Sequence, residues 1–276
     1  MRGRVIVSVD DGLCELPSPG CKAGGLVRLE GAGPLCAQQS GVFCACPGER
    51  VIWRLDVRSL TPTGLFAGGP GMCALLSSPD GARLYALCAD ADCLLMLDSA
   101  TGMPIALNRV GVNPSAMAMD ETGEVIAVAG GECGRTVLLC AHTLNVLSSL
   151  PVAGVAMGVA IGAGAVYTLC LTETLSSALT AYLPGGMRRE VPLSGTPGTL
   201  CLQPDGLLAA TEGRLYAIAA DGSRVLSCRE EPGRARRLLC TKEERLLLDE
   251  WSGTLFRDER GRWLPVLSGA HDLAPA

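Results

Sequence analysis

A unit of about 40 residues recurs along this chain of 276 residues, and the repeat restricts the possible folds more than any other feature. The clearest copy extends from Met72 to Gly111 and contains four short apolar segments separated by turn residues. Four short strands at this period are typical of one blade of a β-propeller. Similar units start near Pro34, Gly71, Asn113, Gly154, Pro197 and Arg234.

Recurring turn signals support four strands per unit, which we name A to D from the central channel outwards. Pro79-Asp-Gly81, Glu121-Thr-Gly123 and Pro204-Asp-Gly206 each follow a predicted A strand and suit tight hairpins. The predicted C strands are Val51–Asp56, Leu94–Asp98, Val137–Ala141, Ala178–Leu183, Leu215–Ala219 and Thr254–Arg257.

The two ends of the chain together predict one more blade. Val5–Val9, Leu13–Leu16 and Leu26–Leu29 have the pattern of B, C and D strands without an A strand. The tail from His271 to Ala276 lies where the next A strand would begin, so we expect it to complete this blade and close the ring. The prediction is one all-β domain, a seven-bladed propeller of four-stranded antiparallel blades, with blades at residues 1–32 plus 271–276, 33–70, 71–111, 112–153, 154–195, 196–233 and 234–270.

The best-formed unit also resembles a known family. Ser78-Pro-Asp-Gly81 followed by Leu84-Tyr85, and Leu95-Met-Leu-Asp98 followed by Thr101-Gly102, look like the YVTN-type β-propeller repeat. That group includes surface-layer-like proteins and propeller lactonases. The resemblance is good over residues 72–111 and weaker over 34–69, 113–153 and 197–222. It implies seven blades but no single activity, because this fold hosts enzymes and binding scaffolds alike.

The uncharged stretch from Pro151 to Thr172 has two interpretations. Gly154, Gly158 and Gly162 are spaced as in packed membrane helices. The same stretch also alternates apolar and small residues at period two, which predicts two strands joined by a glycine turn. Because it is in register with the repeat and no basic cluster flanks it, we expect two strands and no membrane partner.

Composition narrows the classes of partner and compartment. The net charge of −5 disfavours nucleic acid as a partner, because a binding surface for it needs clustered Lys and Arg. Asp10 and Asp11 interrupt the first apolar run too early for a signal peptide, so we expect a cytoplasmic protein. In that reducing compartment the 14 cysteines should mostly be free core thiols, with Cys14 and Cys21 as the exposed ones. We expect a monomer.

Acidic side chains occupy nearly every predicted B–C turn, on the face that surrounds the channel mouth. They predict a negative surface that could bind a cation or a basic ligand, although acids also suit any solvated turn. Arginines near the predicted D–A loops, including Arg236 and Arg237, could ring the same face and bind an anion, or pair with nearby acids such as Glu230 and Glu231. The candidate ligand-binding residues are Asp11, Glu49, Asp90, Asp92, Glu132, Glu173, Glu212, Glu250, Arg109 and Arg234.

No catalytic residue can be assigned. The chain has two histidines, His142 and His271, and lacks the G-x-S-x-G and P-loop motifs. The first functional hypothesis is therefore a non-enzymatic scaffold that binds a protein or small-molecule ligand through its acidic face and needs no cofactor. The alternative is a lactonase-like propeller hydrolase or lyase, with a divalent cation held by the same acids at the channel mouth.

Overall fold

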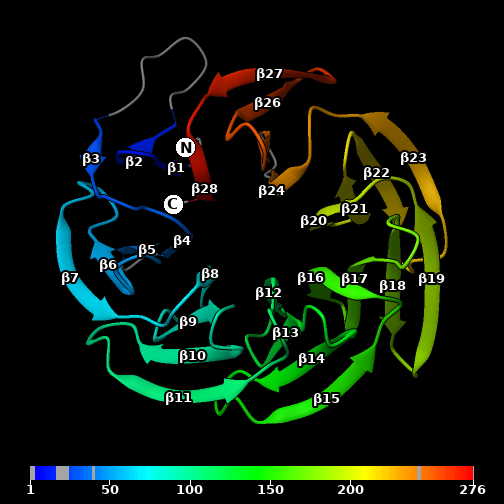
Figure 1. Cartoon of the computed structure of the whole chain (residues 1–276), viewed down its shortest axis with the longest axis horizontal. Helices are drawn as coiled ribbons and strands as arrows, with labels where there is room; N and C mark the ends of the chain where they lie inside the picture. The colour runs from blue at the N-terminus through cyan, green and yellow to red at the C-terminus, as the bar shows by residue number, and fades with distance from the viewer. Residues whose placement is uncertain (1–3, 17–24, 39–40, 241–243, 276) are drawn as a thin grey trace.

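The computed structural model describes residues 4–16, 25–38, 41–240 and 244–275, and every regular element in these ranges is a β-strand. Seven antiparallel sheets of four strands form a ring around a central channel (Figure 1). This confirms the predicted seven-bladed propeller.

Each blade contains four strands in the order A to D from the channel outwards. Blade 1 contains β28 (Ala270–Pro275), β1 (Val5–Val9), β2 (Gly12–Glu15) and β3 (Val27–Arg28). Blade 2 contains β4 (Leu35–Gln38), β5 (Gly41–Cys46), β6 (Val51–Leu55) and β7 (Pro62–Ala67). Blade 3 contains β8 (Met72–Ser77), β9 (Arg83–Cys88), β10 (Cys93–Asp98) and β11 (Pro104–Arg109). Blade 4 contains β12 (Ala116–Met119), β13 (Val125–Ala129), β14 (Arg135–Cys140) and β15 (Val146–Pro151).

The remaining three blades follow the same order. Blade 5 contains β16 (Val155–Gly162), β17 (Ala165–Leu171), β18 (Ser177–Leu183) and β19 (Met187–Leu193). Blade 6 contains β20 (Pro197–Gln203), β21 (Gly206–Thr211), β22 (Arg214–Ala219) and β23 (Val225–Glu230). Blade 7 contains β24 (Ala235–Cys240), β25 (Arg245–Asp249), β26 (Leu255–Glu259) and β27 (Arg262–Leu267). The uncharged stretch 151–172 thus forms β16 and β17, as predicted, and the described chain holds no helix long and apolar enough to span a membrane.

Burial explains the sequence pattern of each position. The B strands are buried on both faces, as in β5 and β21, because they lie between the neighbouring blades. The D strands, such as β15, expose most of their side chains on the outer wall. The apolar clusters join adjacent blades, as where Phe43 of β5 packs with Leu84 of β9. Stacking of one blade on the next therefore buries the core.

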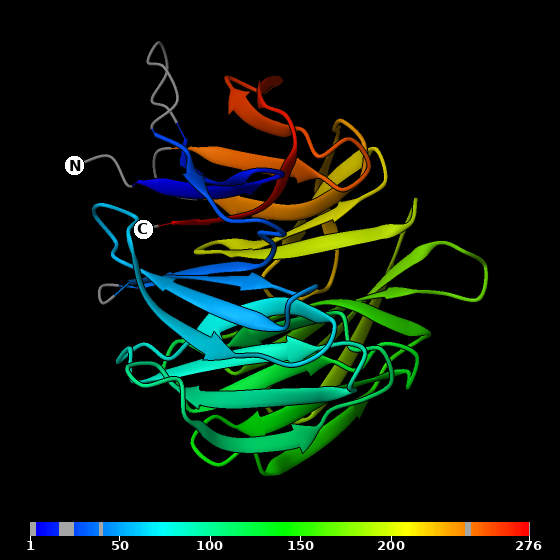
Figure 2. The same cartoon turned by 60° about the vertical axis from the view of Figure 1, so that its left-hand side comes forward.

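The ring closes through the last strand of the chain. β28 pairs antiparallel with β1, with Ile6 opposite Ala274 and Ser8 opposite Asp272, and Figure 2 shows the C-terminal strand beside the N-terminal one. The predicted closure is thus confirmed, and the closing strand begins one residue earlier than expected, at Ala270.

Candidate functional site

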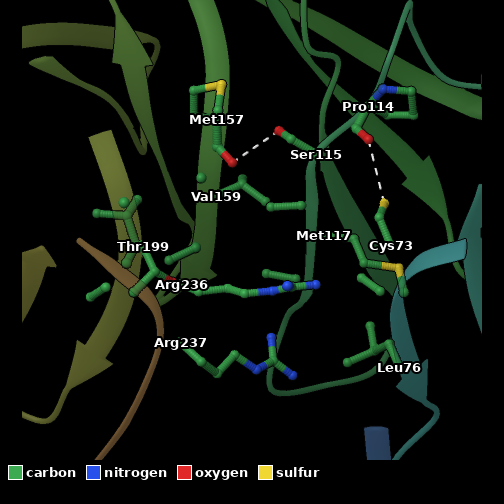
Figure 3. Close-up of a pocket in the computed structure, with 18 of the residues that line it drawn as sticks. Cys73, Leu76, Pro114, Ser115, Met117, Met157, Val159, Thr199, Arg236 and Arg237 are labelled. Atoms are coloured by element: carbon green, nitrogen blue, oxygen red, sulfur yellow. Dashed lines mark hydrogen bonds between the residues drawn. The ribbon is translucent and has the colours of Figure 1, made fainter. Parts of the chain in front are cut away.

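The inner A strands enclose a cavity in the central channel. Its volume is about 810 Å³, and β8, β12, β16, β20 and β24 supply most of its walls. This volume lies in the ordinary range for small-ligand sites. The side chains that Figure 3 shows around it are largely apolar, and include Leu76, Met117, Met157 and Val159.

β-bulges near the start of several A strands decide which side chains enter the cavity. The pairing of β8 with β9 skips Cys73, that of β16 with β17 skips Met157, and that of β24 with β25 skips Arg236. A bulge breaks the strict alternation of side chains along a strand and can redirect one of them. Arg236 and Arg237 are adjacent in sequence, yet both line the cavity, and Figure 3 shows the two guanidinium groups extending into it.

Arg237 is bound to the closing strand. Its Nε lies 3.0 Å from Oδ1 of Asp272, whose Oδ2 accepts the backbone N–H of Leu35 at 2.8 Å. Asp272 is only 8% exposed. This carboxylate therefore joins β24, β28 and β4, the inner strands of three successive blades around the closure.

Arg234 lines the cavity from the connection between β23 and β24. Its Nε is 3.0 Å from Oε2 of Glu250 and 3.0 Å from the carbonyl oxygen of Pro197. The last blade begins at this cluster as predicted, with strand β24 starting at Ala235. The interpretation that pairs the cluster with Glu230 and Glu231 is wrong, because the observed partners are Glu250 and Asp272.

Arg236 differs from both neighbours because no hydrogen bond or ion pair joins it to another residue in the described ranges. Its charge acts on Cys73 of β8, which also lines the cavity. Burial raises the pKa of the Cys73 thiol to about 11, and the Arg236 charge opposes that rise. An exposed guanidinium that has no partner among the described residues thus extends into the channel cavity.

The predicted acids all lie at or beside B–C turns on one face, but they differ in what they contact. Three of them are engaged: Asp92 accepts the N–H of Asn113, Glu212 accepts the hydroxyl of Thr196, both at 2.9 Å, and Glu250 pairs with Arg234. Five others are exposed and form no side-chain hydrogen bond or ion pair with any described residue. We call these the acidic arc, since they occupy five consecutive blades: Asp11, Glu49, Asp90, Glu132 and Glu173.

The predicted residues do not converge on a single point. Glu132, Glu250 and Arg234 line the cavity, whereas Arg109 ends the outermost strand of blade 3 and does not. Carboxylates also occupy turns on the opposite face, including Asp80, Glu121 and Asp205, because any solvated turn tolerates them. Negative charge alone therefore does not distinguish the B–C face.

The two histidines lie on different blades. His271 of blade 1 contacts Asp10 at 2.8 Å, and His142 of blade 4 contacts Glu124 of the same blade at 3.1 Å. Cys14 of blade 1 was expected to be exposed but is buried in an apolar cluster shared with blade 7. Cys21 lies outside the described residues. Within the described ranges, no group of three or more His, Cys, Asp or Glu side chains is placed to hold a metal ion.

The sequence pattern alone gave no sign of the bulge that places Arg236 in the channel. The dense run Arg234-Ala-Arg-Arg237 was visible as a basic cluster, but regular alternation would have placed only one of Arg236 and Arg237 on the channel side. Asp272 carried no signal, because it lies in a six-residue tail with no motif.

Comparison with known proteins supports the fold. No protein-family model matches the sequence, so the YVTN resemblance has no further support, and no curated protein matches it either. Among solved structures, a putative 6-phosphogluconolactonase from Bacteroides uniformis is similar over 98% of each chain, with a TM-score of 0.76 and 11% identity.

Two further structures illustrate how widely this architecture is used. Hydrazine synthase of Kuenenia stuttgartiensis matches 86% of this chain and 80% of its own at a TM-score of 0.70 and 17% identity. BamB from Moraxella catarrhalis matches 89% of this chain and 76% of its own at 0.66 and 16%. Such distant likeness concerns architecture alone. By its strands and by these neighbours, the chain is a seven-bladed β-propeller.

Proposed function

We propose that this protein is a non-enzymatic binding scaffold that holds a basic partner, a protein segment rich in Lys or Arg, against the acidic arc. The observation that carries the proposal is the arc itself: five exposed carboxylates on consecutive blades, none of them paired within the described ranges. Unpaired charges of one sign attract a partner of opposite sign and speed its association.

Exposed apolar side chains on the same face favour a protein segment over a small cation. Trp251, in the B–C turn of blade 7, is 63% exposed, and Leu175, in that of blade 5, is 72% exposed. An indole face can stack against a Lys or Arg side chain through a cation–π contact. Aromatic residues are also enriched at protein interfaces.

The metal-dependent hydrolase has no comparable support, since the arc carboxylates lie on different blades and form no metal-binding group in the described ranges. The proposal includes a monomer in the cytoplasm without a nucleic-acid or membrane partner. The free state of all thirteen described cysteines fits a reducing compartment.

The test is binding of an acetylated, amidated peptide of alternating Lys and Gly, measured by fluorescence anisotropy. The triple variant Asp90→Asn, Glu132→Gln, Glu173→Gln should weaken binding by about 10-fold and flatten its salt dependence. A control triple variant, Glu121→Gln, Asp205→Asn, Glu259→Gln, changes the net charge equally with substitutions on the opposite side of the blades and should bind normally. Equal losses in the two variants would reduce the effect to net charge and refute docking on the arc.

A second variant tests the apolar contribution. Trp251→Ala should weaken binding of the same peptide by about 3-fold, in line with a cation–π contact at an exposed site. Unchanged binding would leave the carboxylates as the only contacts and contradict the role assigned to the indole.

A further inference from the structure

Arg236 offers a free guanidinium to a ligand that enters the channel cavity. Arg234 and Arg237 are already paired there, with Glu250 and Asp272. Arg236 is exposed, extends into the same cavity (Figure 3), and has no hydrogen-bond or ion-pair partner among the described residues. Its N–H donors are therefore available to a ligand.

We propose that the channel cavity is a carboxylate-binding site in which Arg236 forms the principal ion pair and Arg237 supplies further N–H donors. Guanidinium groups bind carboxylates through two parallel hydrogen bonds, a geometry that fixes the ligand as well as attracting it. Arg237 contacts Asp272 through Nε, so its terminal nitrogens point to the same space as those of Arg236 (Figure 3).

The local charge selects a monoanion. The lining holds three arginines and three carboxylates, namely Arg234, Arg236, Arg237, Glu132, Glu250 and Asp272. Arg234 and Arg237 are paired, so Arg236 is the arginine of the lining whose charge no ion pair in the described structure balances. A phosphate dianion would add a second negative charge close to Asp272 and Glu250, which the cavity also contains. The balance therefore favours a carboxylate over a phosphate.

The walls define the rest of the ligand. Leu76, Met117, Met157 and Val159 give the walls an apolar part, beside polar groups such as Ser115 and Thr199, so the ligand should carry an apolar part next to its carboxylate. A second cavity of about 250 Å³ shares Arg237, Leu75, Leu76, Thr199 and Leu200 with the first and continues between β4, β24 and β28. Its walls include Leu35, Leu239 and Leu273, so there is apolar space on both sides of Arg237.

Two sources can provide such a group: a small carboxylic acid with an aliphatic body, or the C-terminal carboxylate of a peptide that ends in an apolar residue. Both require the same guanidinium. The site shares only Glu132 with the acidic arc, because the other four arc residues lie on turns outside the cavity lining and Arg236 lies on an inner strand.

The experiment uses two matched pairs of probes, measured by isothermal titration calorimetry. The first pair is octanoate and its neutral amide. The second is an acetylated Lys-Gly-Lys-Gly-Lys-Leu peptide with a free or an amidated C-terminus. Arg236→Gln removes the charge, and Arg224→Gln, which changes an exposed arginine beyond the channel walls, is the control.

We expect at least one acid to bind about 10-fold more tightly than its amide, and Arg236→Gln to abolish that difference while Arg224→Gln preserves it. A preference for octanoate identifies a small carboxylic acid, and a preference confined to the peptide identifies a chain terminus. Binding that is equal for acids and amides, equal in Arg236→Gln and the wild type, or absent for all four probes overturns the proposal. Tighter binding of inorganic phosphate than of either acid overturns the choice of a monoanion. An arc variant that leaves the cavity lining unchanged, Asp90→Asn with Glu173→Gln, should not weaken octanoate binding, which separates a failure here from a failure of the proposed function.

Discussion

The carboxylates inside the blades and those of the acidic arc are the same chemical group in opposite roles. Asp272, Asp249 and Glu231 are each less than 9% exposed, whereas the five arc residues are solvated and unpaired within the described ranges. We expect the three buried carboxylates to affect stability. Asp272 and Asp249 accept hydrogen bonds, whereas Glu231 is buried without a hydrogen-bond partner in the described structure. The arc residues are free to act on a partner. Position within the blade, more than residue type, decides which role an acid has.

The interior itself divides further. Asp272 and Glu231 have the same exposure, 8%, but Asp272 contacts Arg237 and two backbone N–H groups, while neither oxygen of Glu231 has a hydrogen-bond partner in the described structure. Burial raises the pKa of Glu231 to about 9, the charge of Arg229 opposes the rise, and that of Asp249 adds to it. Asp272 is thus surrounded by hydrogen-bond donors, whereas burial favours the neutral form of Glu231.

The largest difference between the two regions should appear on replacing Asp272. Asp272→Ala leaves Arg237 without its partner and removes an acceptor from the N–H of Leu35, at the point where the ring closes. A hydrogen bond to a charged group contributes about 1.5–3 kcal/mol, and Asp272 accepts the buried N–H groups of Leu35 and Leu273. The ion pair adds less, because the Arg237 side chain is 41% exposed, so the total is about 3–5 kcal/mol. We expect that loss in the free energy of unfolding from urea titration. The arc variant Asp90→Ala is the control and should differ little from wild type, and equal losses would mean that the closure does not depend on this carboxylate.

Glu231→Gln should produce the next largest effect, and with a defined pH dependence. Because its pKa rises from 4.5 when unfolded to about 9 when folded, its contribution to stability is complete below pH 4.5 and is lost as pH rises towards 9. The wild type should therefore lose stability relative to the glutamine variant by roughly 2–4 kcal/mol between pH 5 and pH 8. Parallel stability curves for the two proteins across that range would contradict a neutral buried Glu231.

The sequence predicted the regular parts of this fold and missed the irregular ones. Period-two alternation and turn residues located the blades and the closing strand, since these depend on local patterns. Each predicted C strand started within two residues of the observed one. For example, the predicted strand began at Val137, whereas β14 begins at Arg135. Arg135 and Thr136 extend the strand pairing, but as polar residues they do not belong to the apolar pattern used for the prediction.

The candidate site was less predictable for a physical reason. Turn acids such as Glu132 and Glu173 are visible in the sequence because turns interrupt the apolar strands. Arg237 and Asp272 pair with each other across two blades and are 35 residues apart in the sequence. Ring closure brings them together, so no local sequence pattern links them. The bulge at Arg236 depends on how β24 pairs with β25, which alternation does not reveal.

Asp249 offers a third, smaller effect, because it shapes a turn and does not hold the ring. Its carboxylate accepts the N–H of Arg234 at 2.8 Å and the hydroxyl of Ser252 at 2.6 Å. Burial works to raise the pKa of Asp249, but these bonds outweigh it and hold the pKa below 3.8. The stabilisation is therefore present above pH 3.8 and lost as pH falls through the folded pKa. Asp249→Ala should cost about 1–2 kcal/mol at pH 7 and less in acid, measured by thermal unfolding; a loss that is constant with pH would show that the charge is not involved.

The smallest effect on stability should come from the arc, where the expected effect on binding is large. The triple variant Asp90→Asn, Glu132→Gln, Glu173→Gln removes three exposed charges that have no partner in the described structure, so its free energy of unfolding should stay within about 0.5 kcal/mol of the wild type. Any change should be a slight gain that disappears in high salt, because neutralising like charges relieves repulsion and salt screens it. A loss above about 1 kcal/mol would show that these acids hold the blades as Asp272 does, and would remove the distinction between the two regions. Normal stability combined with weak peptide binding would instead assign the inner carboxylates to the fold and the arc to recognition.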